Sequence, residues 1–267
     1  MLQWDPIGIP DDHDEYANLL QAETFAEGRL SNDSHPFWKH FESFHILQEP
    51  TYASKYPPGQ AIFLFVGIKL FGHPWYGVLL SCMIMVSCIV WMIRGYLSTK
   101  WALWIGVILV LRFALWNYWS SSYWGGAVAA IGGALIFGAV PRLKSEKSGR
   151  LIICSLCFGL GLALLSQTRP FEGLLLSIIP GLYLLKLIYQ RLMERQWKMV
   201  NSLMLPALLV LMVNFAFASY YNYKITGDPL KMPYSLHAEQ YSVQPPFLFL
   251  DKRETPPTYN HLEFDRH

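Results

Sequence analysis

The residues of this sequence best suited to acid–base chemistry stand close to its start, in the acidic run that includes Asp14 and Glu15. A carboxylate placed beside a hydroxyl group can accept its proton and so turn an alcohol into a nucleophile. Acids are also favoured at the start of a helix, where the helix dipole stabilises negative charge. We assign that structural role to Asp11 and Asp12. Asp14 and Glu15 remain as the catalytic candidates.

A candidate phosphate ligand follows at Lys55, directly before Tyr56 and the pair Pro57 and Pro58. Two prolines end any preceding helix and are well placed to begin the next one. We therefore expect Lys55 and Tyr56 at the height of the lipid headgroups, where an ammonium group can hold a phosphate. The structural alternative for Lys55 is ordinary snorkelling of the charge to the membrane surface.

Two further charged positions lie near the ends of apolar segments. Arg169 and Glu172 stand in a very short connection, and Arg112 stands about one turn inside the end of its apolar segment. Charges beside a membrane cavity are candidates for function, whereas anchoring and snorkelling are the structural alternatives. We keep Arg169 as a second phosphate ligand, and Glu172 and Arg112 as further candidates.

Three histidines, His35, His40 and His45, raise the question of a metal site. Their spacing of five residues does not place them on one face of a helix, and no zinc-binding signature accompanies them. We assign no metal ligand and leave a divalent cation open as a cofactor. His35 is kept as a candidate polar group of the site.

The composition indicates that these residues are carried by a membrane protein. Hydrophobic residues make up 53% of the chain and charged residues only 15%, against about 25% in soluble domains. The net charge of +2, without a basic stripe, gives no support for nucleic-acid binding. All four cysteines lie inside apolar runs, where they are expected to pack as small hydrophobic residues.

The apolar pattern predicts an all-α integral membrane protein with about six transmembrane helices, a short interfacial helix and external loop helices. A spanning helix needs about 20 mostly apolar residues. The six segments that approach this length are Trp75–Ile93, Trp101–Trp116, Gly125–Val140, Leu151–Gln167, Gly173–Tyr189 and Met199–Ser219. A shorter run, Pro58–Phe71, ends at Gly72 and is interpreted as the interfacial helix.

The basic residues predict the orientation of these spans. Three connections, after Ile93, Val140 and Tyr189, carry most of the basic residues near the apolar segments, so the positive-inside rule places them in the cytoplasm. Both polar ends then face away from the cytoplasm, in a bacterial inner (plasma) membrane. The expected domains are an extracytoplasmic loop at 1–57, a transmembrane domain at 58–219 with its interfacial helix at 58–72, and an extracytoplasmic segment at 220–267.

An external N-terminal loop must be carried across the membrane, and no signal peptide precedes Trp4. We therefore expect a further transmembrane helix before residue 1 in the natural protein. We also expect the polar segment at 220–267 to continue beyond His267.

The order of these features resembles the C-type membrane glycosyltransferases, the superfamily of the protein O-mannosyltransferases, the aminoarabinose lipid A transferases and the Rgt-like lipopolysaccharide glycosyltransferases. The resemblance rests on an acidic pair opening a short helix that ends near Gly28, a Lys-x-Pro-Pro stretch closing the loop, and an interfacial helix ending at Phe71-Gly72. It covers roughly residues 11–190. The superfamily's usual stretch is Lys-Pro-Pro, and Tyr56 intervenes here.

The resemblance implies a hexosyl- or pentosyltransferase that moves a sugar from a polyprenyl-phosphate donor to a glycan, lipid or protein acceptor. It implies that Asp14 is the general base, with Glu15 as its neighbour, and that Lys55 holds the donor phosphate. Our hypothesis for the reaction is a transfer with a single base and inversion at the sugar carbon. Some members carry a second acid in the next external loop. The segment Asn117–Trp124 has none.

Two other functions fit the same sequence. A lipid or sugar-lipid transporter would share the apolar segments, although transporters usually bury ionisable groups near the middle of the bilayer. A non-catalytic assembly subunit of the cell envelope would share them too, and it predicts that Asp14, Lys55 and Arg169 do not converge on one cavity.

Overall fold

The computed structural model describes residues 9–115, 117–145, 147–243, 257, 259 and 260. The described chain is mostly helical, with one small sheet near its start. Its longer helices are α1 (His13–Ala26), α2 (Gly59–Phe71), α3 (Trp75–Ile93), α4 (Thr99–Leu115), α6 (Gly126–Ala139), α7 (Ser148–Ser166), α8 (Pro170–Met193), α9 (Trp197–Thr226) and α10 (Pro233–Tyr241). The short ones are α5 (Tyr118–Ser121) and the 3₁₀ turns η1 (Trp38–His40) and η2 (Val140–Arg142).

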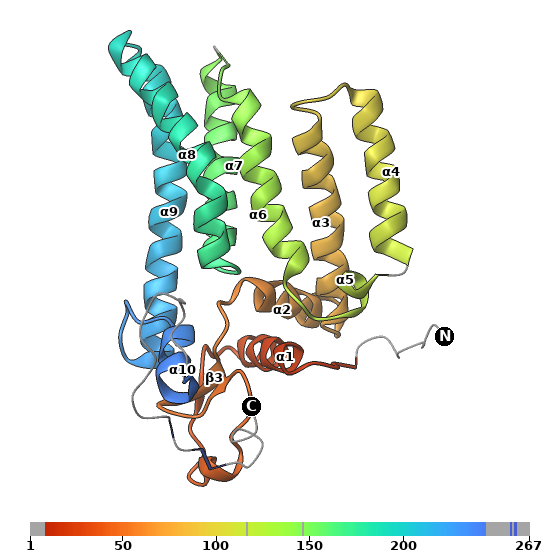
Figure 1. The fold of residues 1–267 in the computed structure, drawn as a ribbon, viewed down its shortest axis with the longest axis vertical. Helices are drawn as coiled ribbons and strands as arrows, with labels where there is room; N and C mark the ends of the chain where they lie inside the picture. Colours follow the sequence, from red (N-terminus) through yellow and green to blue (C-terminus); the bar gives the residue numbers. More distant parts are fainter. Residues whose placement is uncertain (1–8, 116, 146, 244–256, 258, 261–267) are drawn as a thin grey trace.

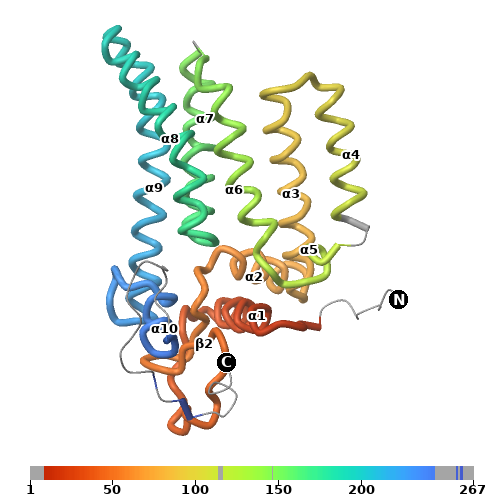
Figure 2. The backbone as a smooth tube through the Cα atoms, viewed as in Figure 1, coloured from red at the N-terminus to blue at the C-terminus, as the bar shows by residue number. Residues whose placement is uncertain are grey.

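The helices form a layered bundle. The apolar helices α3, α4, α6, α7, α8 and α9 run alongside one another, and α1 and α2 lie across one end of them (Figure 1). The sheet and α10 lie at that same end, which we call the loop end (Figure 2). The structure thus separates an apolar bundle from a polar layer.

Four described helices, α3, α7, α8 and α9, are long and apolar enough to cross a membrane. α4 has 17 residues, and the apolar stretch of α6 with η2, Gly126–Arg142, is also shorter than these four. The prediction of a mostly helical chain with helices able to cross a membrane is therefore confirmed. The number of six spans stays a prediction, because α4 and α6 are short for the hydrocarbon thickness.

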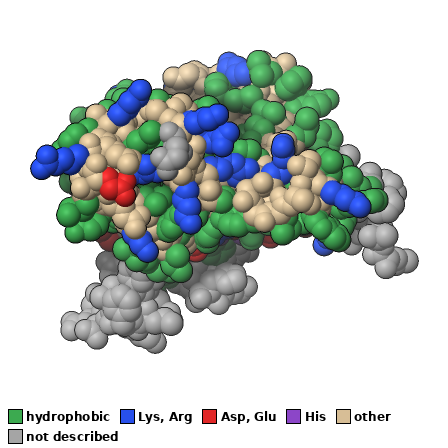
Figure 3. Space-filling view, turned by 90° about the horizontal axis from the view of Figure 1, so that it is seen from above, with side chains coloured by type: hydrophobic (Ala, Val, Ile, Leu, Met, Phe, Trp, Pro, Cys, Tyr) green, Lys and Arg blue, Asp and Glu red, His purple; other side chains and the backbone are tan. Residues whose placement is uncertain are grey.

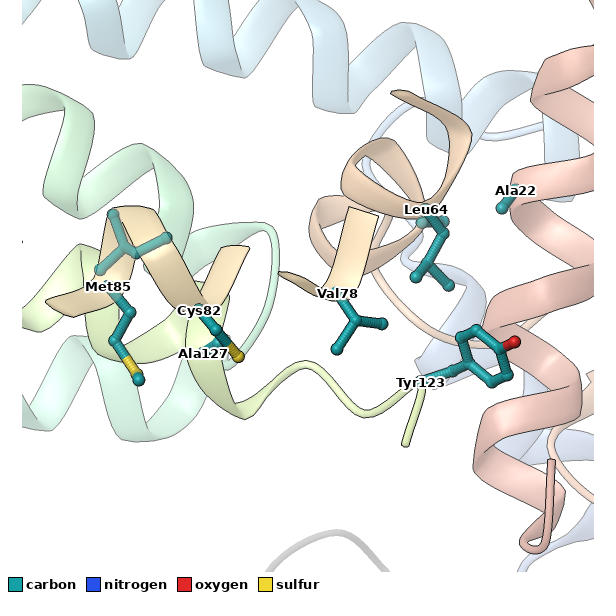
Figure 4. Packing of buried hydrophobic residues seen from close by; sticks show 9 residues of the cluster. Ala22, Leu64, Val78, Cys82, Met85, Tyr123 and Ala127 are labelled. Carbon is teal, nitrogen blue, oxygen red and sulfur yellow. The ribbon is translucent and has the colours of Figure 1, made fainter. Parts of the chain in front are cut away.

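The loop end is held to the bundle by a cluster of buried apolar side chains. Ala22 from α1, Leu64 from α2 and Val78 from α3 meet there with residues of α6 (Figure 4). Tyr123, in the loop before α6, is 1% exposed and belongs to the same cluster. Burial of such apolar surface is the main force that orders these helices.

The ends of α1 and α2 follow the sequence closely. Asp12 precedes α1 in an extended conformation, and its carbonyl accepts the N–H of Glu15 at 3.0 Å. Its carboxylate makes no cap bond to the helix, so the expected capping role is filled by its backbone. Gly28 and Gly72 adopt φ values of +78° and +76° just after the two helices, a conformation that favours glycine.

A small antiparallel sheet departs from the all-α prediction. Its strands are β1 (Asn32–Asp33), β2 (Ile46–Leu47) and β3 (Thr51–Ser54), with β3 in the middle. Asn32 pairs with Tyr52, and Ile46 with Ser54. Strands of two to four residues leave no detectable alternation in a sequence, so the pattern had no signal for them.

Helix α9 is longer than predicted. It runs to Thr226 rather than Ser219, and its 30 residues correspond to about 45 Å. A hydrocarbon core is only about 30 Å thick, so α9 extends beyond it. Tyr221 and Ile225 are consequently buried against the loop end together with Leu47 and Ala53. Of the expected segment 220–267, residues 244–256, 258 and 261–267 lie outside the described residues.

The face opposite the loop end is rich in Lys and Arg, as a view from above shows (Figure 3). This face is formed by the connections α3–α4, α6–α7 and α8–α9. The basic connections of the sequence therefore lie at one end of the bundle. Under the positive-inside rule this arrangement favours a cytoplasmic position for that end, which stays a prediction.

Helix α2 begins in direct contact with the connection between α7 and α8. The backbone N–H of Gly59 donates to the carbonyl of Gln167 at 2.8 Å, and a Cβ at Gly59 would lie 2.5 Å from that oxygen. This close contact between the start of α2 and the Gln167 carbonyl, which only glycine permits, brings the Lys55–Pro58 turn beside Arg169.

We predict that Gly59→Ala lowers the free energy of unfolding by about 1–3 kcal/mol, because the methyl group forces α2 away from Gln167. Gly181→Ala in α8 is the matched control, since a Cβ there meets nothing within 4 Å. The control should leave stability unchanged or raise it slightly. Thermal unfolding of both variants in detergent measures the difference, and equal stability of the two variants would contradict the close approach.

Candidate functional site

A cavity of about 300 Å³ opens at the loop end and collects several of the predicted residues. Asp14 reaches it from α1, Tyr56 from the turn before α2, and Arg169 and Glu172 from the start of α8. Tyr234 of α10 completes the wall. We call this the first cavity. Residues far apart in the chain are therefore brought to one place.

Asp14 is half-buried and contacts two neighbours. The hydroxyl of Tyr56 donates to its Oδ1, and Nε2 of His45 lies 3.1 Å from the same oxygen. Among the described residues, no hydrogen bond is made to Oδ2. A carboxylate with one oxygen fixed and the other open to a ligand suits a general base.

The turn that carries Tyr56 is held from α1. The Gln21 amide donates to the Tyr56 carbonyl at 3.0 Å and also to the hydroxyl of Tyr221 on α9. The Tyr56 N–H donates to Ser54 Oγ at 3.1 Å. Burial, together with the bond to Asp14, raises the pKa of Tyr56 well above its usual range. The phenol therefore stays protonated and donates to Asp14.

Lys55 lies on the other side of this turn, at a second cavity of about 430 Å³. The two cavities adjoin, since both are lined by Pro57, Pro170, Met232 and Tyr234. The Lys55 ammonium lies 5.2 Å from the ring centroid of Tyr56 and 5.3 Å from that of Tyr234. Burial lowers the pKa of Lys55 to about 8, against the opposing effect of the Asp14 charge.

The second cavity follows α9 away from Lys55 into the apolar bundle. Its wall includes Leu211, Phe215 and Ala218 of α9, with Asn222 near the loop end. From residue 211 to residue 222 the helix rises about 16 Å. The same cavity is also lined by Ser166, Gln167 and Asn214. The cavity thus has a cation at one end and a mostly apolar wall with a few neutral polar groups, which suits an amphiphile with an anionic head.

Two imidazoles sit beside Lys55. The rings of His45 and His237 lie 6.5 Å apart, and burial with the nearby Lys55 charge lowers their pKa values to about 4 and about 3. Both are therefore neutral near pH 7. Neither Nδ1 of His45 nor Nε2 of His237 has a hydrogen-bond partner within the described part of the chain.

Arg169 and Glu172 form an exposed ion pair in the first cavity. Their side chains are 51% and 66% exposed, and Arg169 Nη1 lies 3.7 Å from Glu172 Oε1. Such a pair contributes little to stability. Because it is half-exposed, the Arg169 guanidinium is accessible to an anionic ligand.

Glu15 takes a different place from Asp14. It is 1% exposed, and its carboxylate accepts the N–H of Tyr123 at 3.0 Å and the hydroxyl of Tyr118 at 3.4 Å. Burial raises its pKa, partly offset by the Tyr123 bond. Glu15 does not line either cavity, and its contacts fix α1 to the loop before α6. It positions Asp14.

Two further sequence candidates also lie outside the cavities. His35 is exposed and packs against the rings of Phe37 and Phe41, and Arg112 is exposed on α4. Neither contributes to the walls of the first or second cavity. No group of three or more His, Cys, Asp or Glu side chains placed to hold a metal ion is found among the described residues.

The sequence pattern missed several residues of the site. His237 and Tyr234 come from α10, which Pro233 begins at a position that favours proline and could have been recognised. His45 was considered only as a metal ligand. Gln60 lines the first cavity from within the apolar run Pro58–Phe71, where nothing in the pattern distinguished it. Trp124 lines it from the end of the short connection Asn117–Trp124, whose aromatic residues are also typical of a membrane interface.

Comparisons with protein-family models, with curated proteins and with solved structures gave no match for this chain. Two observations therefore bear on function: the geometry of the two cavities, and the order of sequence features that resembles the C-type membrane glycosyltransferases.

We predict that acid destabilises the protein partly through His45. The unfolded chain takes up a proton near pH 6.5, whereas the folded pKa is about 4, so stability falls as the pH falls between these values. His45→Asn should reduce this loss, and asparagine tolerates the φ of +66° found there. Thermal midpoints from pH 7 to pH 4 measure the effect.

The control for this prediction is His40→Asn, because His40 is exposed. It should lose stability in acid to the same extent as the wild type. An acid loss in His45→Asn as large as that of the wild type would contradict a buried neutral imidazole at this position.

Proposed function

We propose that this protein is a membrane glycosyltransferase that moves a sugar from a polyprenyl-phosphate donor to a hydroxyl group of an acceptor. The observation that most supports this proposal is that Asp14 and Arg169 line one cavity, while Lys55 lines an adjoining cavity that follows α9 into the bundle. A base, phosphate ligands and a place for a lipid chain therefore lie side by side. We also propose six spans and an extracytoplasmic site.

Asp14 acts as the general base in this proposal. The acceptor hydroxyl gives its proton to the Asp14 carboxylate, and its oxygen bonds to the sugar carbon as the bond from that carbon to the phosphate oxygen breaks. Attack from the face opposite the phosphate inverts the carbon. Tyr56 and His45 hold the carboxylate through Oδ1, which supports its orientation.

Lys55 and Arg169 stabilise the leaving group. The polyprenyl phosphate departs with the electron pair of the broken bond, so charge develops on its oxygens, and cations fixed nearby favour that change. A phosphate leaves without being protonated, so a second carboxylic acid is not required. The pKa of Lys55, about 8, would rise when an anion binds beside it, which keeps the ammonium charged.

The donor's lipid chain occupies the second cavity. Its wall along α9 is mostly apolar, with Leu211, Phe215 and Ala218, and includes the neutral polar side chain of Asn214. A lipid-linked donor would thus present its phosphate near Lys55 and its sugar toward Asp14. The acceptor reaches Asp14 from the loop end.

The two alternative functions are less well supported. The charged residues discussed lie at the loop end rather than midway along the bundle, where a transporter's ionisable groups are usually found. Asp14 and Arg169 line the same cavity and Lys55 lines the adjoining one, whereas an assembly subunit gives no reason for these three residues to lie so close together.

We predict that Asp14→Asn lowers the rate of sugar transfer by about 10²- to 10⁴-fold, because the amide cannot accept the acceptor's proton. The measurement uses membranes containing the full-length protein and polyprenyl-phosphate donors with a radiolabelled sugar. Transfer of the label to an endogenous acceptor is followed with time.

Asp12→Asn is the matched control. Asp12 stands at the start of the same helix and accepts a hydrogen bond from Tyr118 at 3.0 Å, but it lines neither cavity. It should retain transfer within about twofold. Unchanged transfer in Asp14→Asn would exclude this base, and donor that crosses the membrane intact would favour the transporter.

A further inference from the structure

Gln60 is a buried amide that has no hydrogen-bond partner in the part of the chain that the structure describes. It stands in the first turn of α2, is 3% exposed and lines the first cavity. Neither its Nε2 nor its Oε1 forms a hydrogen bond with any described residue. Leaving a buried amide unpaired costs free energy, and most buried polar groups in proteins are paired.

Trp124 presents a second such group to the same cavity. Its indole Nε1 is buried, and no acceptor for it is found in the described part of the chain. The backbone at the next residue, Gly125, lies against Gln60, because a Cβ there would lie 3.3 Å from Cβ of Gln60 and 3.8 Å from its Oε1. Two residues lining one cavity therefore carry three hydrogen-bonding groups, two donors and an acceptor, that have no partner among the described residues.

We infer that Gln60 and Trp124 recognise hydroxyl groups of the donor's sugar. This inference rests on the proposed function and identifies the residues that would determine which sugar is bound. A hydroxyl both donates and accepts, so it can satisfy the Gln60 carbonyl, its amide N–H and the Trp124 indole N–H. The groups are neutral, which suits an uncharged sugar better than a phosphate.

The shape of the first cavity agrees with this ligand. Its volume of about 300 Å³ is at the lower limit of small-molecule sites, large enough for one sugar ring. Apolar side chains of Phe171 and Met232 line it beside the polar groups, and sugar rings present C–H faces to such surfaces. Asp14 lines the same cavity, so its carboxylate would lie beside the bound sugar that the acceptor hydroxyl attacks.

The test compares Gln60→Met with Gln48→Met in the full-length protein. Methionine keeps the length of the side chain and removes both polar atoms. Gln48 is the matched control, because it is 1% exposed, lines neither cavity and donates to the Phe41 carbonyl at 2.7 Å. Affinities are measured by calorimetry for polyprenyl-phosphate glucose, galactose and mannose, and for polyprenyl phosphate without a sugar.

We predict that Gln60→Met weakens binding of the best sugar-bearing donor about tenfold, through lost hydrogen bonds. Binding of the sugar-free polyprenyl phosphate should not change. The thermal midpoint of Gln60→Met should equal or exceed that of the wild type, because an unpaired buried amide is removed. Gln48→Met should have a lower thermal midpoint and unchanged affinities. Trp124→Phe should repeat the selective loss for the sugar-bearing donor.

Two results would overturn the inference. Equal donor affinity in wild type and Gln60→Met would mean that the amide does not read the sugar. A loss for donor and sugar-free lipid alike, with a lower thermal midpoint, would mean a structural role. Neither result affects the transfer assay with Asp14→Asn. Conversely, sugar binding that depends on Gln60 without any transfer by the wild type would support the inference and contradict the proposed reaction.

Discussion

The arrangement of the loop end depends on one buried side chain, Gln21. Its amide joins α1 to the carbonyl of Tyr56 and to the hydroxyl of Tyr221 on α9, and it is only 3% exposed. The turn with Lys55 and Tyr56 is thereby fixed between Asp14 on one side and the second cavity on the other. The contact between Gly59 and Gln167 holds the same turn against the start of α8. These contacts therefore set the positions of Asp14, Lys55 and Arg169 relative to one another.

Burial then sets the chemical state of the groups around this turn. Lys55, His45 and His237 all lie at partly buried positions, which lower their pKa values, and the imidazoles are neutral near pH 7. Tyr56 stays protonated, and its hydroxyl donates a hydrogen bond to the Asp14 carboxylate. Because the two histidines are neutral, Lys55 and Arg169 carry the positive charge beside this turn. The same low polarity makes each unpaired group, such as the Gln60 amide, costly unless a ligand satisfies it.

The sequence predicted the local features well and the long-range ones poorly. The start of α1 followed from its acids and that of α2 from Pro57 and Pro58, and both helices end before a glycine. The bounds of α3 were predicted to the residue because Pro74 and Arg94 delimit its apolar run. The sheet had strands too short to detect, and the polar end of α9 concealed its extension to Thr226. Asp14 and Arg169 were selected from the sequence, but not their common cavity. Contacts such as Gln21 with Tyr221, 200 residues apart, have no signal in a single sequence.

Photolabelling tests most directly whether an anionic lipid lies along α9 with its head at Lys55, as we propose. A polyprenyl phosphate carrying a diazirine in its chain would be irradiated in membranes with the full-length protein, and the labelled peptides identified by mass spectrometry. We predict label on Leu211, Phe215 and Ala218, lost on adding unlabelled polyprenyl phosphate. Helix α4 is the internal reference, because Leu103, Trp104 and Val107 are exposed apolar residues outside both cavities. Label spread equally over α4 and α9, and unaffected by the competitor, would contradict a lipid-phosphate site.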